Sequence, residues 1–190
     1  VNANGSVDIR QGEEWAAAGN ATVRMEDAYS VNFSKTAING TEELVGAALS
    51  VYEGEDSTGT RVESWTSGTD QKVIGLGPGT YTMVETSAPL GYEIAESITF
   101  RVNANGSVDI RQGEEWVAAG NATVRMEDAY SINFSKTAIN GTAELENALL
   151  RVYEGEGAGG TLIESWTSGT AQKVIGLGPG IYTMVETSAL

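Results

Sequence analysis

The sequence predicts an all-β protein built from tandem immunoglobulin-like β-sandwich domains. Three observations lead to this prediction: an internal repeat one domain long, short stretches in which apolar and polar residues alternate, and turn signals between those stretches. The chain has 190 residues, of which 41% are hydrophobic and 19% are charged. This composition is typical of a folding chain and not of a disordered acidic tail.

The internal repeat has a period of 101 residues. Residues 1–89 align with residues 102–190, and 74 of these 89 pairs are identical. Because this period is longer than the roughly 20–50 residues of solenoid repeats, each unit should have its own core. We expect one complete domain at residues 31–130, preceded by the C-terminal strands of another repeat at 1–30 and followed by the N-terminal part of the next repeat at 131–190. Since the sequence begins without an initiator Met, we also expect a fragment of a longer protein.

Within one unit, seven or eight short stretches have the pattern of β-strands. They are VNFSK, LSVYEG, VESWTS, QKVIGL, TYTMVET, ESITFRV, SVDI and ATVRMEDAY. NG, GT, GPG and PLG turn signals separate them, and GLGPG is a tight turn and not a phosphate loop, because no helix follows it. Only EELVGAAL and GEEWVAAG could be helical, and both are poor helices. Strands of this number and spacing predict two sheets that pack their apolar faces together.

Composition and charge exclude several classes of function. Without Cys or His, the chain has no disulfide, no thiolate or imidazole metal site and no His-dependent catalytic triad. The net charge of -15 disfavours nucleic acids and anionic lipids as partners, and no stretch approaches the roughly 18 apolar residues of a membrane span. We therefore expect no cofactor, no metal, no nucleic-acid partner and no membrane insertion. A calcium site at Glu53, Glu55 and Asp56 is a weaker interpretation than a solvated loop.

Strand alternation places three ionisable side chains on apolar faces. Lys35 shares its face with the Val and Phe of VNFSK, and Asp128 shares its face with the Val and Met of VRMED. Glu85 lies with the Tyr and Met of YTMVE, which form a better inward face than the Thr and Val between them. In the simplest interpretation Lys35 extends to the rim and the two carboxylates lie in solvent. Otherwise three ionisable groups point into one core.

The motifs FSK, LGPGTY, VETSAP, LGYE, ITFRVN and MEDAY, in this order, resemble the Cna-type B domain of Gram-positive surface adhesins and pilins. ATVRMEDAY is similar to the last strand of the fibronectin-binding-protein member, the source of the split peptide tag SpyTag. The resemblance implies that Lys35 and Asp128 form a spontaneous isopeptide bond assisted by Glu85. Burial would favour the neutral forms of these groups, and the fold would hold the reactants together.

The resemblance also implies a function and a location. It implies a structural stalk or fibre repeat of a secreted, cell-surface or cell-wall adhesin or pilus-like filament, in which the bond forms once and no external substrate is turned over. The alternative is a ligand-binding adhesin module that recognises a host protein or glycan. The near-identity of the two copies favours the stalk, because a binding site needs only one specialised unit.

Asp27, Lys136 and Glu186 are the repeat counterparts of the three candidate residues. Asp27 is too far along an extended chain, at roughly 26 Å, to react with Lys35. We expect that residues 1–30 of one chain complete residues 131–190 of another by strand addition. An Asp27–Lys136 bond would then join copies head to tail. The alternative is a boundary without biological meaning.

Eight asparagines lie in N-x-S/T sequons, a pattern of either N-glycosylation or turn chemistry. They are Asn4, Asn20, Asn32, Asn39, Asn105, Asn121, Asn133 and Asn140.

Overall fold

The computed structural model describes residues 1–19, 23 and 25–188 and confirms the all-β prediction. Its strands are β1 (Asp8–Gln11), β2 (Glu14–Ala17), β3 (Tyr29–Ala37), β4 (Ala48–Glu53), β5 (Arg61–Thr66), β6 (Lys72–Leu76), β7 (Gly79–Ser87), β8 (Ile98–Val102), β9 (Val108–Gln112), β10 (Glu115–Ala118), β11 (Thr123–Asp128), β12 (Tyr130–Phe134), β13 (Leu149–Glu154), β14 (Leu162–Thr167), β15 (Lys173–Leu177) and β16 (Tyr182–Ser188). A short 3₁₀ helix, η2 (Gly120–Ala122), precedes β11.

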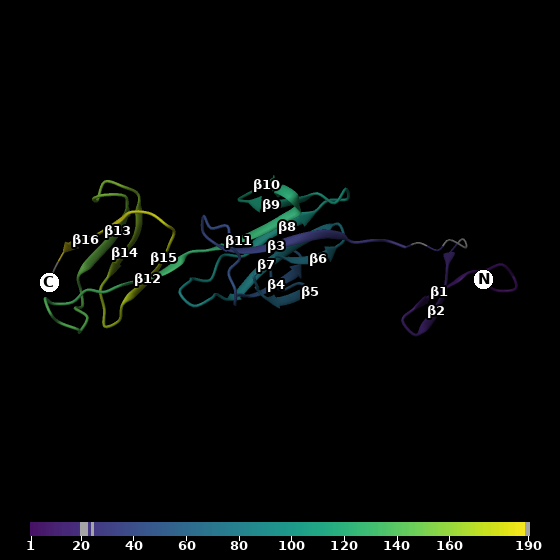
Figure 1. The fold of residues 1–190 in the computed structure, drawn as a ribbon, viewed down its shortest axis with the longest axis horizontal. Helices are drawn as coiled ribbons and strands as arrows, with labels where there is room; N and C mark the ends of the chain where they lie inside the picture. The colour runs from purple at the N-terminus through teal and green to yellow at the C-terminus, as the bar shows by residue number, and fades with distance from the viewer. Residues whose placement is uncertain (20–22, 24, 189–190) are drawn as a thin grey trace.

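Strands β3 to β11 form a two-layered sandwich, which lies between the β1–β2 hairpin and the β12–β16 segment (Figure 1). The larger sheet has the order β10-β9-β8-β7-β4-β5, and the smaller sheet has the order β11-β3-β6. Strand β11 pairs with β3 in parallel, whereas the other pairs of these two sheets are antiparallel. The first and last strands of the sandwich are therefore neighbours.

The apolar faces of the two sheets form one core. Its buried members are Val31, Phe33, Ala47, Leu49, Val51, Ile74, Leu76, Tyr81, Met83, Phe100, Val102, Val108, Val124 and Met126. The Phe33 ring lies edge-on to Trp65 and Phe100, with centroid distances of 5.6 and 5.5 Å. The side chains that alternation predicts to point inward on β3, β7 and β11 are the ones that fill this core.

Neither segment that could be helical from its sequence is a helix. Residues 115–118 form β10, which adds an edge strand to the larger sheet. Residues 42–47 form bends and a single β-bridge, from Glu43 to Thr36. Gly46 has a φ of 103°, a left-handed conformation that glycine tolerates and that a helix excludes.

Several sequon asparagines lie at turns, whereas Asn32 and Asn133 lie within strands β3 and β12. Asn39, Asn121 and Asn140 have positive φ angles, which asparagine tolerates better than most residues. The side chain of Asn105 accepts hydrogen bonds from the backbone and hydroxyl of the serine two positions later. Turn chemistry accounts for these four positions. Asn20 lies outside the described residues.

Residues 130–188 repeat the first part of the sandwich. The pairs β12–β15 and β14-β13-β16 correspond to β3–β6 and β5-β4-β7. Some side chains that are buried in the sandwich are more exposed here, because no counterparts of β8 to β11 cover them within this segment. Ile132 is 39% exposed where its counterpart Val31 is fully buried, and Met184 is 39% exposed where Met83 is fully buried.

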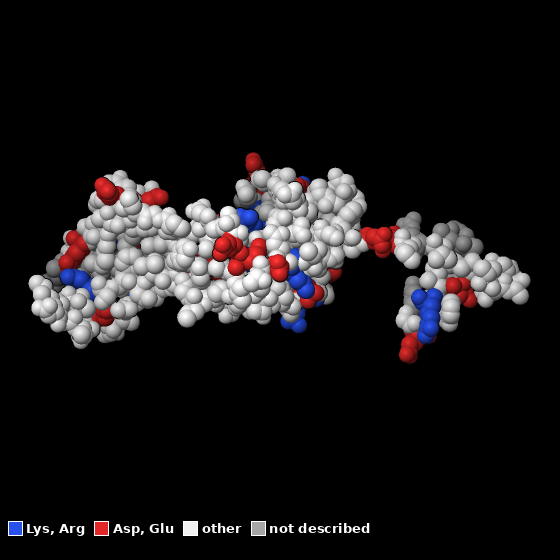
Figure 2. All heavy atoms as spheres, in the orientation of Figure 1, with Lys and Arg blue, Asp and Glu red and all other residues white. Residues whose placement is uncertain are grey.

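Acidic side chains are visible on all three parts of the chain, with basic side chains beside some of them (Figure 2). Glu55 forms an ion pair with Arg111, and Asp56 accepts hydrogen bonds from Thr58. Within residues 1–19, 23 and 25–188, no group of acidic side chains has the arrangement of a metal site. In the same part of the chain, no helix has the length and apolar character of a membrane span.

Candidate functional site

Lys35 lies inside the sandwich, near the C-terminal end of β3. Its side chain is 1% exposed, so the ammonium group does not reach the rim. The backbone of β3 holds it there, because Val31 and Phe33 occupy the same face of the strand and are buried in the core. Alternation therefore carries the lysine inward with its apolar neighbours.

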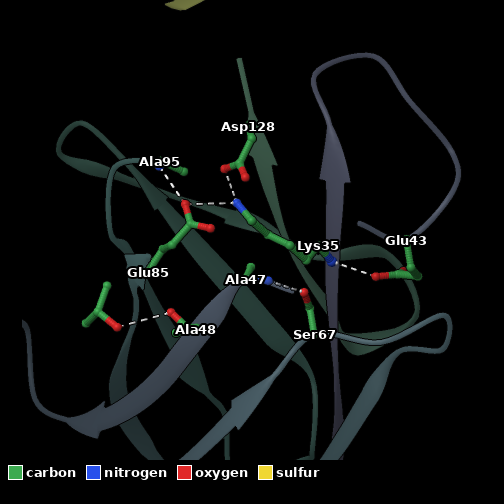
Figure 3. A network of polar contacts seen from close by, with 9 residues as sticks. Lys35, Glu43, Ala47, Ala48, Ser67, Glu85, Ala95 and Asp128 are labelled. Atoms are coloured by element: carbon green, nitrogen blue, oxygen red, sulfur yellow. Dashed lines mark hydrogen bonds and ion pairs between the residues drawn. The ribbon is translucent and has the colours of Figure 1, made fainter. Parts of the chain in front are cut away.

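Asp128 is the last residue of β11 and is fully buried. In the parallel register, Met126 of β11 lies opposite Lys35, and Asp128 lies opposite Ala37. Residues two apart on a strand share a face, so the Asp128 carboxyl projects on the same side as the lysine and one step further along. The Lys35 side chain follows this diagonal, and its Nζ forms an ion pair with Oδ1 of Asp128 (Figure 3).

Glu85 approaches the pair from β7 of the facing sheet. Its Oε2 lies 3.2 Å from Nζ of Lys35 and accepts a hydrogen bond of 2.7 Å from the backbone N–H of Ala95 (Figure 3). The glutamate is 5% exposed. Three strands from both sheets thus bring one amine and two carboxyl groups together in the core.

Burial changes the protonation of this cluster. The pKa of the Asp128 carboxyl is raised to about 6, chiefly because burial disfavours its charged form. The adjacent Glu85 carboxyl also raises this pKa, while the Lys35 ammonium opposes the rise. Oε1 of Glu85 and Oδ2 of Asp128 have no hydrogen-bond partner among the described residues. Two buried carboxyl groups beside a single amine favour arrangements in which a carboxyl oxygen carries a proton.

The arrangement can carry out one kind of chemistry on itself. A neutral amine adjacent to a protonated carboxyl group is a nucleophile beside its electrophile, and the fold holds both in place. A second carboxyl group in contact with the amine can accept or donate the proton that moves during condensation.

Glu43 supports the lysine from the other side of β3, and the sequence reasoning missed it. Its carboxylate accepts a hydrogen bond of 2.7 Å from the backbone N–H of Lys35 (Figure 3). It accepts a second one, also of 2.7 Å, from the hydroxyl of Ser34. The bridge between Glu43 and Thr36 therefore extends the backbone pairing of β3 beside the reactive lysine. Comparison of the two copies of the repeat could have indicated Glu43. Its counterpart Glu144 is also a glutamate, whereas the neighbouring Glu42 is replaced by Ala143.

The second copy of the site is incomplete. Nζ of Lys136 lies 3.3 Å from Oε2 of Glu186, as in the sandwich, but the two side chains are 27% and 32% exposed. Lys136 follows the end of β12, and its N–H donates a hydrogen bond to Glu144. Asp27 is exposed, and no ion pair among the described residues joins it to Lys35 or Lys136. The structure thus brings together Lys35, Glu85 and Asp128 but leaves Asp27 apart.

Residues 29–115 match the family model described as SpaA, a prealbumin-like fold domain. This match covers most of the sandwich and contains Lys35 and Glu85. No curated protein matches the chain significantly.

Several solved structures are similar to the chain. A pilus-presented adhesin, Spy0125 (Cpa), is 32% identical, with a TM-score of 0.43, over 49% of this chain and 21% of that chain. The C-terminal fragment of the pilus adhesin SpaC from Lactobacillus rhamnosus GG is 19% identical, with a TM-score of 0.36, over 85% of this chain and 76% of that one. The Bacillus anthracis TIE protein is 21% identical, with a TM-score of 0.36, over 84% of this chain and 28% of that one. The chain thus spans about a fifth of the Cpa structure.

Proposed function

We propose that the sandwich is a self-cross-linking stalk domain of a secreted bacterial adhesin or pilus-like fibre, in which Lys35 and Asp128 form an isopeptide bond. One observation carries the proposal: Lys35, Asp128 and Glu85 form a buried cluster at the junction of the first and last strands. The family match over residues 29–115 supports it. The likeness of ATVRMEDAY to the last strand of the fibronectin-binding member supports Asp128 as the electrophile.

The reaction is a condensation that needs no external reagent. The neutral Nζ of Lys35 attacks Cγ of Asp128, a C–N bond forms, and the C–OH bond of the carboxyl group breaks. Glu85 gives its proton to the oxygen of Asp128 and takes one from the attacking nitrogen, so it ends as it began. One water leaves for each bond. Because the product is an amide within the protein, the reaction occurs once and the domain is not an enzyme.

Three features favour a stalk over a ligand-binding module. The bond would tie the first strand of the sandwich to its last strand, so that tension crosses the domain through β3 and β11. Only Ala129 separates β11 from β12, so successive repeats follow one another with almost no linker. The repeats are also nearly identical, as expected for spacers. Recognition of a host protein or glycan is the alternative, and no cluster of the described residues specifically favours it.

Joining of copies is a further part of the proposal. Lys136 and Glu186 have the spacing of the reactive lysine and glutamate, and both are partly exposed. Strand β12 has β15 on one side, and in the sandwich the other side of the equivalent strand is filled by β11. Residues 1–30 have the sequence of that missing strand. Strand addition from a second copy would bring Asp27 to Lys136.

Intact mass under denaturing conditions tests both parts. A Lys35–Asp128 bond lowers the mass of the chain by one water, about 18 Da. The Glu85→Gln variant, which keeps the shape but cannot exchange the proton, should retain the full mass. Glu186→Gln is the matched control and should show the same loss as the unmodified chain. Full sequence mass in the unmodified chain overturns the bond, and species at multiples of the chain mass that vanish with Lys136→Ala support joining of copies.

A further inference from the structure

Strand β15 has a glycine, Gly176, in its interior, where strands usually carry larger side chains. Gly176 lies between Ile175 and Leu177, which are both 8% exposed and face the core of their own repeat, so Gly176 faces outward. Glycine inside a strand weakens it and often marks a place where another backbone approaches closely. Gly178 follows just beyond the end of the strand.

The neighbour of both glycines is the preceding repeat. A Cβ atom at Gly176 would lie 3.1 Å from Cγ of Glu93 and 3.1 Å from Cβ of Ala129. A Cβ atom at Gly178 would lie 3.1 Å from Cγ2 of Ile38. Glu93 and Ile38 belong to two loops of the sandwich, and both loops therefore sit directly on β15 and the turn that follows it.

The loop of residues 89–95, which we call the joint loop, is also bonded to the connection between the repeats. The N–H of Glu93 donates to the carbonyl of Ala129 at 3.0 Å, and the N–H of Ser131 donates to the carbonyl of Gly91 at 2.9 Å. Between these bonds the backbones form an antiparallel bridge. The connection at residues 129–131 is thus hydrogen-bonded to the backbone of the joint loop in the same way as one β-strand is bonded to its neighbour.

Side chains add to the backbone contacts of the joint loop. The rings of Tyr92 and Tyr130 lie 5.0 Å apart at 34°, a distance at which aromatic pairs are favourable. The hydroxyl of Ser131 donates a hydrogen bond to the carboxylate of Glu93. Each of these contacts pairs a residue of the joint loop with one at the start of the next repeat.

Both loops are anchored in the sandwich next to the reactive cluster. The N–H of Ala95, at the end of the joint loop, donates to Glu85 at 2.7 Å. The N–H of Ile38 donates to the carbonyl of Asp128 at 2.9 Å. The surface on which the next repeat rests is therefore held by the core and is not a free loop.

The start of the sandwich shows half of the same arrangement. Ser30 pairs with Gly75 as Ser131 pairs with Gly176. A Cβ atom at Gly75 would lie 3.2 Å from Cβ of Ala28, the counterpart of Ala129. At both junctions, therefore, a strand glycine lies against the alanine that connects the repeats: Gly75 against Ala28 and Gly176 against Ala129.

We infer that the joint loop and Ile38 form a docking surface whose partner is a second copy of this repeat, bound through its first strand and the glycine-bearing strand beside it. The interface holds successive repeats in one orientation. It goes beyond the proposed cross-link and does not need it, since none of its contacts involves the side chains of Lys35 or Asp128.

Distances between spin labels in the full chain test this inference. Because the chain has no Cys, Asp70→Cys and Ala171→Cys place labels at equivalent exposed positions of the two repeats. The expected result is a narrow distance distribution in this labelled parent. Gly176→Val, which forces a side chain into Glu93 and Ala129, should broaden it at least twofold. Gly75→Val is the matched control at the other junction and should leave it unchanged.

A second variant covers the case in which Gly176→Val unfolds the repeat that carries it. Removing the contacts from the sandwich side with Tyr92→Ala and Glu93→Ala should also broaden the distribution, whereas Glu96→Ala, at an exposed neighbour, should not. A broad distribution in the parent, or a narrow one in all variants, overturns the inference. The mass of each sample reports the state of the Lys35–Asp128 bond separately.

Discussion

Pulling the chain from its ends tests whether the sandwich can extend. Tension enters β3 at Tyr29, passes along the strand to Lys35 and, if the bond is present, crosses directly to Asp128 and leaves through the connection to β12. The 92 residues between Lys35 and Asp128 then lie outside the path of the force. A disulfide-like staple between neighbouring parallel strands should therefore make the domain nearly inextensible.

Glu85→Gln removes this protection if the glutamate is needed for the bond. Without the bond, the same 92 residues can extend at about 3.4 Å each, which gives a step of roughly 300 Å less the folded length. Single-molecule force spectroscopy of the full chain should show this step in the variant and not in the unmodified chain. Glu186→Gln should behave like the unmodified chain. The same long step in the unmodified chain would refute the reasoning.

The other effects concern stability. Without the bond in Glu85→Gln, Lys35 and Asp128, which are 93 positions apart in the sequence, are no longer tied together in the unfolded chain. The free energy of unfolding should fall by about 4.6 kcal/mol and the calorimetric melting temperature by roughly 20–35 °C. An unchanged melting transition contradicts this. Ser67→Ala removes the acceptor for the buried N–H of Ala47 at 2.9 Å, and urea unfolding should show a loss of about 1–3 kcal/mol. Glu43→Ala leaves the N–H of Lys35 unpaired and should slow bond formation after refolding, as followed by mass; an unchanged rate would show that this support is not needed.

The strands and their inward faces could be predicted because a strand has a period of two. The same rule selected Lys35, Glu85 and Asp128 as core-facing, and all three are buried in the structure. Local pattern alone does not show that they meet. Their contact depends on the parallel pairing of β3 with β11, whose strands are far apart in the sequence, and the family resemblance was needed to connect them.

Two features depended on contacts that periodicity does not report. Glu43 reaches the site because the bends after β3 return its side chain to the backbone of Lys35, and no alternation rule predicts that return. The strand at residues 115–118 has only four residues and begins with a glutamate, so its pairing with β9 decides its conformation more than its composition does. The contact of the joint loop with the next repeat is likewise tertiary.

The pH dependence of bond formation separates two roles for Glu85. If Glu85 acts in its protonated form, the reactive state has a neutral Lys35 amine and two protonated carboxyl groups. The state with a charged Lys35, one protonated carboxyl group and one carboxylate holds the same number of protons. The reactive state therefore forms from it by proton transfer within the cluster, with no proton taken from the solvent. That state loses a proton above a pH of about 6, where Asp128 ionises. The rate should then fall about tenfold per pH unit above 6.

If Glu85 acts only as a carboxylate, the reactive state holds one proton fewer than in the first case. A neutral amine with protonated Asp128 holds as many protons as the ammonium–carboxylate pair, so the rate should stay level from pH 6 to 8 and fall only below 6, as the cluster takes up a further proton. The assay dilutes chain that has been kept unfolded since synthesis into buffers of set pH, stops samples in acid and follows the loss of one water by mass. A decline above pH 6 assigns the proton transfer to Glu85, and a level rate contradicts the proposed mechanism while leaving the bond itself in place.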